Sequence, residues 1–213
     1  MRTLIWGAGA IGGTLSAYLA RAGGDVTVVD TVVEHVDAIA RDGLHVTGPI
    51  DDFTARVPAF TPETLSGTWD EIILATKAHH TGAAAGALRP HLARSGCVVS
   101  AQNGLNELAI ADLVGAERTV GAFVNFGADY LEPGVIHYAG RGAVVVGEID
   151  GRITPRVNAI RDAWRQFDPR AIVTPNIWGY LWAKEAYGAM LFATALTNES
   201  IACLLYTSPS PRD

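Results

Sequence analysis

The feature that most constrains the fold is the glycine-rich stretch "GAGAIG", which directly follows a short apolar run. Gly7, Gly9 and Gly12 have G-x-G-x-x-G spacing between a predicted strand ("RTLIW") and a predicted amphipathic helix ("AIGGTLSAYLARAG"). In such a unit the first glycine permits the turn, the second lets a phosphate approach, and the third lets helix and strand pack closely. Spacing alone is weak evidence, but this context predicts a dinucleotide-binding turn. The predicted cofactor-binding residues of the turn are Gly7, Ala8, Gly9, Ala10, Ile11 and Gly12.

Asp30 ends the next predicted strand, "DVTVVD". A carboxylate at this point accepts hydrogen bonds from the adenosine ribose of NAD(H), and its charge repels the 2′-phosphate of NADP(H). No Arg or Lys occurs in the ten residues after Asp30 to neutralise such a phosphate. We therefore predict NAD(H) or NADP(H) as the cofactor, with Asp30 favouring NAD(H). The alternative role for Asp30 is that of a solvated turn residue.

Strand-like runs alternate with helical patterns over residues 1–174, which is typical of a parallel sheet covered by helices. Two β-rich runs, 118–130 and 134–148, are joined by the turn "LEPG" and predict an antiparallel pair. The stretch 176–198 is predicted to begin a wholly helical region. The predicted fold class is α/β, with a Rossmann-type dinucleotide-binding domain followed by the start of an all-helical second domain. Further helices are predicted at 32–43, 81–93 (broken at Pro90), 107–115 and 154–167.

Two other predicted strands end in polar residues, which a strand buried in the core does not need. "EIILATK" ends at Lys77, and "CVVSAQN" ends at Asn103. An open α/β sheet has its ligand crevice at the carboxyl ends of its parallel strands, so we expect both residues to face the cofactor. The alternatives are a surface lysine and an Asn-Gly turn. The histidines that follow Lys77, at positions 79 and 80, are predicted to be solvated.

Lys184 is a single lysine within the otherwise apolar run "NIWGYLWAKEAYGAMLFATALTN". Desolvation would bring the pKa of such a lysine below its ordinary value of about 10.4, so that it releases a proton more readily. A positioned ammonium group could then stabilise and protonate the oxygen of a ketone that is being reduced. The alternative is a lysine whose long side chain reaches solvent from the edge of a core helix.

The composition excludes several classes of partner. Lys and Arg total 16 against 22 Asp and Glu, and the basic residues form no run, so nucleic acid is not an expected partner. Cys97 and Cys203 have neither metal-ligand spacing nor a disulfide framework, which favours a reducing cytoplasm and predicts no metal site. No uncharged run is both long and apolar enough to span a bilayer, so no membrane contact is expected.

Four motifs together, "WGAGAIGG", "ATKA", "SAQNGLNE" and "NIWGYLWAKEAYGA", resemble the ketopantoate reductase (2-dehydropantoate 2-reductase) family over about residues 1–202. The resemblance implies an NAD(P)-dependent oxidoreductase of pantothenate biosynthesis, with NADPH and a small 2-oxo acid in a cleft between two domains. It also implies that Lys184 is the general acid, that Asn103 is both catalytic and cofactor-binding, and that Lys77 binds the cofactor. A homodimer is left open.

The chain also departs from this family. Members that reduce ketopantoate commonly have asparagines four and eight residues after the lysine, where this chain has Gly188 and Phe192, which suggests a related and bulkier 2-oxo acid. The family's helical domain continues for roughly another hundred residues, so the resemblance implies a truncated second domain at 175–202. The tail 203–213, "CLLYTSPSPRD", lacks a helical period and is predicted to be non-native, with an ordinary disordered terminus as the alternative.

Two other functions remain open from the sequence. Another 2-hydroxy-acid dehydrogenase or an opine-type dehydrogenase would share this order of domains. A dinucleotide-binding regulator without catalytic activity belongs to a different class, and it would be favoured if Lys77 or Asn103 pointed away from the nicotinamide position.

Overall fold

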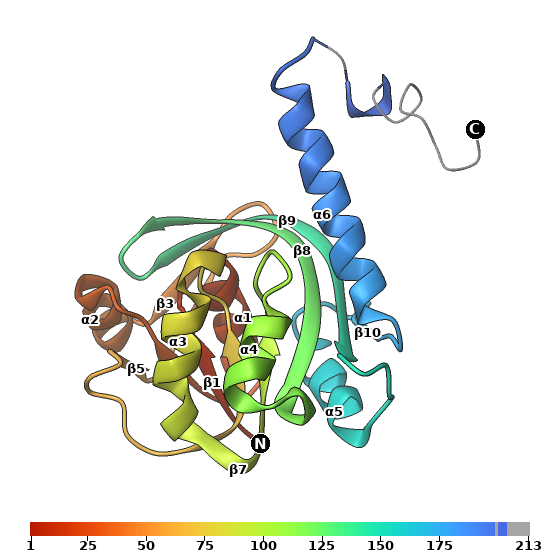
Figure 1. Cartoon of the computed structure of the whole chain (residues 1–213). Helices are drawn as coiled ribbons and strands as arrows, with labels where there is room; N and C mark the ends of the chain where they lie inside the picture. Colours follow the sequence, from red (N-terminus) through yellow and green to blue (C-terminus); the bar gives the residue numbers. More distant parts are fainter. Residues whose placement is uncertain (199, 204–213) are drawn as a thin grey trace.

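The computed structural model describes residues 1–198 and 200–203 and shows one large, strongly curved sheet with helices on both faces (Figure 1). The helices are α1 (Ala10–Arg21), α2 (Val33–Asp42), α3 (Thr81–Leu88), α4 (Glu107–Val114), α5 (Pro155–Trp164) and α6 (Ile177–Thr194). The strands are β1 (Arg2–Trp6), β2 (Asp25–Val29), β3 (Leu44–Thr47), β4 (Phe53–Ala55), β5 (Ala59–Phe60), β6 (Trp69–Leu74), β7 (Leu92–Ser100), β8 (Thr119–Glu132), β9 (Val135–Glu148) and β10 (Ile172–Val173).

The strand order is β4-β3-β9-β8-β7-β6-β1-β2-β5, with β10 paired to β9. From β5 to β8 all neighbours are parallel, and this half has the order of a doubly wound dinucleotide-binding sheet. The predicted Rossmann-type α/β fold is therefore confirmed. The chain passes from β1 to β2 on one side and returns to β6 on the other, so the sheet has its switch point between β1 and β6. A ligand crevice is expected at the carboxyl ends of these two strands.

The central strands are buried on both faces because each is covered by helices or by the hairpin. In β1, Leu4 and Trp6 face a core that includes residues of α3 and α4, whereas Ile5 faces a second core that includes residues of α1 and α5. This alternation follows from the two-residue period of a strand. Helix α1 is itself buried over residues 12–19, since it packs against β2 on one side and against the curved β8–β9 hairpin on the other.

The predicted antiparallel pair is confirmed in β8 and β9, which are each 14 residues long. The helix predicted at 81–93 is shorter than expected. It ends at Leu88, Pro90 lies in a 3₁₀ turn, and Leu92 already begins β7. The Pro- and Asp-rich connection between β3 and β6 contains two short strands that the sequence did not reveal, β4 and β5. Both are too short to show an alternating pattern.

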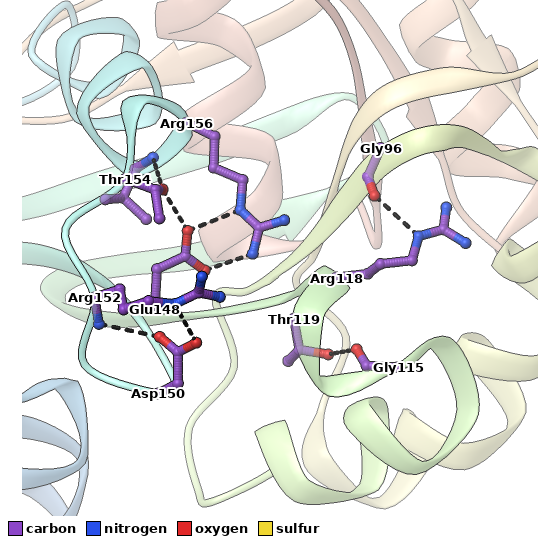
Figure 2. A network of polar contacts seen from close by, with 10 residues as sticks. Gly96, Gly115, Arg118, Thr119, Glu148, Asp150, Arg152, Thr154 and Arg156 are labelled. Carbon is purple, nitrogen blue, oxygen red and sulfur yellow. Dashed lines mark hydrogen bonds and ion pairs between the residues drawn. The ribbon is translucent and has the colours of Figure 1, made fainter.

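A partly buried ion pair fastens α5 to the end of β9, opposite the start of β8 and thus at the amino-terminal side of the parallel strands (Figure 2). The Arg156 guanidinium donates to both carboxylate oxygens of Glu148, at 2.8 Å from Nε to Oε1 and 2.5 Å from Nη2 to Oε2. The Thr154 hydroxyl donates to the same carboxylate, whose side chain is only 3% exposed. Removal of Arg156 would leave this carboxylate buried without its cation, which is strongly destabilising.

Helix α6 leaves the sheet and projects away from it (Figure 1). Asn176 caps its first turn by accepting a hydrogen bond from Gly179 N at 3.1 Å, and the Trp178 indole N–H donates to Ile149 O. Ile177 and Leu181 are its only buried residues, counted over the part of the chain that the structure describes. No described helix combines the length and apolar character needed to cross a bilayer. The predicted non-native tail lies outside the described residues, except for Cys203.

Candidate functional site

A cleft of about 640 Å³ lies at the carboxyl ends of four parallel strands. Its walls are the glycine turn after β1, residues 30–32 after β2, residues 75–78 with His80 after β6, and residues 101–103 after β7. The cleft therefore occupies the switch point of the sheet, where a doubly wound fold binds its ligand. Its volume is within the range of small-molecule and cofactor sites.

The glycine turn has the geometry that a phosphate-binding loop requires. Gly7 has φ of +99°, and a Cβ there would lie 2.9 Å from Thr76 N. A Cβ on Gly12 would overlap the Gly7 carbonyl oxygen, so both positions need glycine. At Gly9, which lines the cleft, a Cβ would meet no described atom within 4 Å. The backbone is thus open toward the cleft at this one position.

The start of α1 faces the cleft and has the electrostatics of an anion site. Ala10 and Ile11, its first residues, line the cleft. Within the described chain, no side chain caps this helix and its first turn contains no acidic residue. The amide groups and the positive end of the helix dipole are therefore available to a phosphate. These features fit the pyrophosphate of a dinucleotide.

Asp30 directly follows β2 and lines the same cleft. Its Oδ2 accepts a hydrogen bond from Ala8 N at 2.8 Å, and its Oδ1 accepts one from Val32 N at 3.0 Å. The carboxylate is thereby oriented against the glycine turn. Each oxygen retains a further lone pair that can accept a hydrogen bond from a ribose hydroxyl.

The structure brings Lys184 to Asn103, across 81 residues of sequence. Lys184 Nζ donates to Asn103 Oδ1 and to Val124 O, both at 2.5 Å, and lies 5.5 Å from the centroid of the Phe123 ring. Asn103 and Lys77 both line the cleft, although Lys184 lies beside it rather than on its wall. Lys184 thus lies next to the part of the cleft that Asn103 lines.

The ammonium group of Lys184 has neutral partners. It donates to two carbonyl oxygens and lies near an aromatic ring, and within the described part of the chain its third N–H is left for another acceptor. Burial lowers the pKa of Lys184 below its ordinary value, and the nearby Glu185 carboxylate opposes this effect. A lowered pKa makes the ammonium a better proton donor near neutral pH.

Sequence reasoning missed one residue that organises the site. Gln102 is buried, and its side-chain amide donates to Thr76 O at 2.8 Å and to the Thr81 hydroxyl at 3.0 Å. It therefore ties the loop after β7 to the loop after β6, which carries Lys77. In the sequence, the clue to its role was that Gln102 directly precedes Asn103, a predicted site residue.

His80 is exposed, as expected, but lines the cleft. No group of metal-ligating side chains occurs among the described residues.

Fold, turn and cleft define a Rossmann-type dinucleotide-binding protein. The family model for "Ketopantoate reductase PanE/ApbA" matches residues 3–151. The chain therefore belongs to the ketopantoate reductase family, as the resemblance in its motifs predicted.

The relatives agree with this assignment. The chain is 35% identical over 187 residues to the 2-dehydropantoate 2-reductase of Pyrococcus abyssi, covering 86% of this chain and 60% of that protein. The crystal structure of 2-dehydropantoate 2-reductase from Geobacter metallireducens superposes with a TM-score of 0.82 at 30% identity, covering 89% of this chain and 63% of that one. D-mandelate dehydrogenase, solved with NADH and anilino(oxo)acetate, shares the fold at 23% identity with a TM-score of 0.80. The match covers 86% of this chain and 60% of that one. The chain spans about three fifths of the length of the Pyrococcus abyssi protein and of the 2-dehydropantoate 2-reductase of Pyrococcus horikoshii.

Proposed function

We propose that this chain is the cofactor-binding part of an oxidoreductase that reduces a 2-oxo acid to the 2-hydroxy acid with NADH or NADPH. The observation that supports this most strongly is the contact of Lys184 Nζ with Asn103 Oδ1 at the edge of the cleft. It pairs a proton donor of lowered pKa with an amide that also borders the cofactor site. A regulator without chemistry would not need such a donor there.

In the proposed complex, the glycine turn and the start of α1 hold the pyrophosphate, and Asp30 binds the adenosine ribose. Asp30 favours NADH, because a 2′-phosphate would lie against its carboxylate. Lys77 and Asn103 line the part of the cleft away from Asp30, since they follow β6 and β7, and there they contact the nicotinamide half. The bound dinucleotide supplies a hydride to the ketone carbon of the substrate.

Lys184 acts as the general acid in this proposal. Its ammonium group donates a hydrogen bond to the ketone oxygen, stabilises the negative charge that develops there, and transfers one proton to that oxygen. The ketone gains a hydride and a proton and becomes the alcohol, while Lys184 becomes a neutral amine that recovers its proton from solvent. Asn103 Oδ1 and Val124 O keep Nζ in place by accepting hydrogen bonds from its other two N–H groups.

The proposed substrate is ketopantoate or a related 2-oxo acid with a bulkier side chain. Gly188 and Phe192 lie one and two helical turns beyond Lys184, on the same face of α6. A Cβ on Gly188 would meet no described atom within 4 Å. Compared with two asparagines, these residues offer space and an aromatic ring instead of polar contacts.

We further propose that residues 1–174 form the dinucleotide-binding domain and that 175–202 begin the substrate domain.

The proposed reaction is tested by a steady-state assay of the chain extended to the length of its relatives, with NADH and NADPH against a panel of aliphatic and aromatic 2-oxo acids. Reduction of at least one 2-oxo acid, with loss of NADH or NADPH, is expected. Consumption that requires an added amino acid would indicate an opine-type dehydrogenase. Dinucleotide binding without reduction of any panel member would instead favour a regulator.

A further inference from the structure

His35, in the first half of α2, is a buried histidine whose two ring nitrogens contact two distant backbone groups. The side chain is 1% exposed. Gly134 N lies 2.9 Å from Nδ1, and Nε2 lies 2.8 Å from Ala8 O. A backbone N–H can only donate and a carbonyl can only accept. Nδ1 is therefore the acceptor and Nε2 carries the proton, so the two contacts together define the neutral Nε2–H tautomer.

The contact to Ala8 fixes the centre of the glycine turn. Ala8 N donates to Asp30 Oδ2, and Ala8 O accepts from His35, so the peptide groups on both sides of Ala8 are held by side chains. A trans peptide is planar, with its C=O and N–H pointing in opposite directions. Because His35 holds the Ala8 carbonyl toward α2, the N–H of Gly9 in the same peptide points the other way.

The turn is open at Gly9. Gly9 lines the cleft, and a Cβ there would meet no described atom within 4 Å. The amide of this residue is therefore presented where an approaching phosphate would lie. His35 itself does not line the cleft, so it acts on this amide only through the peptide plane.

The other ring nitrogen joins the turn to the β8–β9 hairpin. Gly134 lies in the turn at the tip of this hairpin with φ of +79°, and its carbonyl accepts from His45 N at 2.8 Å. The Tyr130 ring, from β8 of the same hairpin, packs edge-on against His35 at a centroid distance of 5.0 Å. The histidine ring is thus clamped by the hairpin while it holds the turn.

We propose that His35 is a positioning residue for the dinucleotide. Its Nε2–H tautomer, enforced by Gly134, orients the Ala8–Gly9 peptide so that the Gly9 amide is ready to bind phosphate. This inference rests on the proposed dinucleotide binding, and it assigns to α2 and the hairpin a role in cofactor affinity.

Two variants separate this role from a merely structural one. His35→Gln places an amide nitrogen near the position of Nε2, so it retains a donor for Ala8 O and loses the acceptor for Gly134. His35→Asn places a carbonyl oxygen near Nδ1, so it retains the acceptor and loses the donor. Both variants make one of the two hydrogen bonds, and both lose part of the ring. Because Asn is one methylene shorter than Gln, Tm is measured for both variants as well, and a role in packing alone would make the losses of NADH affinity follow the losses of Tm.

The experiment measures NADH affinity by fluorescence titration, and backbone amide exchange of the cofactor-free protein by NMR. His35→Asn should bind NADH about tenfold more weakly, as expected for the loss of one positioned hydrogen bond, whereas His35→Gln should stay within about threefold of the unmodified chain. The Ala8 amide should exchange faster only in His35→Asn. Ring nitrogen shifts of the unmodified protein should show a protonated Nε2.

Equal losses in the two variants, an unchanged Ala8 amide in His35→Asn, or a protonated Nδ1 with bare Nε2 would each overturn the inference. The proposed function fails differently. If the unmodified chain is folded and binds neither NADH nor NADPH, dinucleotide binding itself is refuted, and the role of His35 in it is refuted as well. Binding by the unmodified chain with equal affinity in both variants refutes only the role of His35.

Discussion

The strands that carry the cleft are buried on both faces, whereas α6, which carries Lys184, buries only Ile177 and Leu181 among the residues that the structure describes. Trp182 is 61% exposed and Phe192 is 80% exposed, while Leu4 and Ile5 in β1 are fully buried. The dinucleotide half of the site is therefore built on a rigid sheet. The proposed proton donor is held mainly by the first two turns of a helix and by its own contacts to Asn103 and Val124. Binding and chemistry should accordingly respond differently to perturbation.

The largest effect is expected at Lys184. In the chain extended to the length of its relatives, Lys184→Ala should lower kcat by about 10²–10⁴ and leave NADH affinity nearly unchanged, because the ammonium acts on the reacting oxygen. Stopped-flow turnover and fluorescence titration measure the two quantities separately. Lys184→Arg is the matched control, since it keeps the charge but does not release a proton. Full activity in the Arg variant would show that charge alone suffices, and full activity in the Ala variant would eliminate the general-acid role.

The second prediction concerns the burial of an ionisable side chain in the sheet region that carries the cleft. Glu107, at the start of α4, is fully buried, and burial raises its pKa to about 7 from an ordinary 4.5. The folded state thus binds more protons than the unfolded state between these values, so this group makes the free energy of unfolding fall as pH rises from about 4.5 to 7.

Glu107→Gln removes this ionisation. It should match the unmodified chain near pH 4.5 and exceed its free energy of unfolding at pH 8 by on the order of 2–3 kcal/mol. Urea unfolding at the two pH values measures the difference. A variant with the same pH dependence as the unmodified chain would mean that Glu107 titrates at its ordinary pKa, in contact with water.

The third prediction separates the fold from the binding function within the glycine turn. Gly9→Ala should leave Tm unchanged, because the added Cβ meets no described atom within 4 Å. It should nevertheless weaken NADH binding by about tenfold or more, because the Cβ would occupy space that the pyrophosphate needs. Gly12→Ala is the control. Its Cβ would overlap the Gly7 carbonyl, so it should lower both Tm and affinity. Thermal unfolding and titration of both variants test the pair, and wild-type affinity in Gly9→Ala would place the cofactor elsewhere.

The smallest effect is expected at Asp30. The unmodified chain should bind NADH more tightly than NADPH, and Asp30→Ser should reduce this preference several-fold by removing the charge beside the 2′-position. Competitive titration of both cofactors gives the ratio. A preference for NADPH in the unmodified chain would show that backbone amides or another cation outweigh Asp30.

The sheet half was predictable because its signals are local. The glycine spacing, the polar residues Lys77 and Asn103 and the helix at Lys184 can all be read within short windows. The strands themselves end three residues earlier than predicted, at Leu74 and Ser100. The supports of the site were not predictable, because they depend on pairings between distant segments. Gln102 reaches Thr76 across 26 residues, and Gly134 reaches His35 across 99. Nothing in the sequence near Ala8 indicates that a histidine from α2 will hold its carbonyl.

The short strands β4 and β5 were missed for a related reason. β5 has only two residues, and its position at the sheet edge comes from pairing with β2 rather than from its own pattern. The exposure of α6, in contrast, could be expected from its composition, since apolar residues occur all round this helix and one sheet surface covers only part of it.

The central claim is that residues 1–174 bind the cofactor, while the reduction of substrate depends on how α6 places Lys184. This claim has one direct test. NADH binding and reduction of the 2-oxo acid panel are measured on the same purified sample of the 213-residue chain. The account predicts saturable NADH binding together with turnover far below the usual enzyme range of about 1–10³ s⁻¹, because α6 is held by few contacts and a displacement of about 1 Å costs on the order of 10² in rate. Turnover within that range would contradict the dependence on a better-held α6, and a folded sample that binds no NADH would contradict the assignment of the cleft.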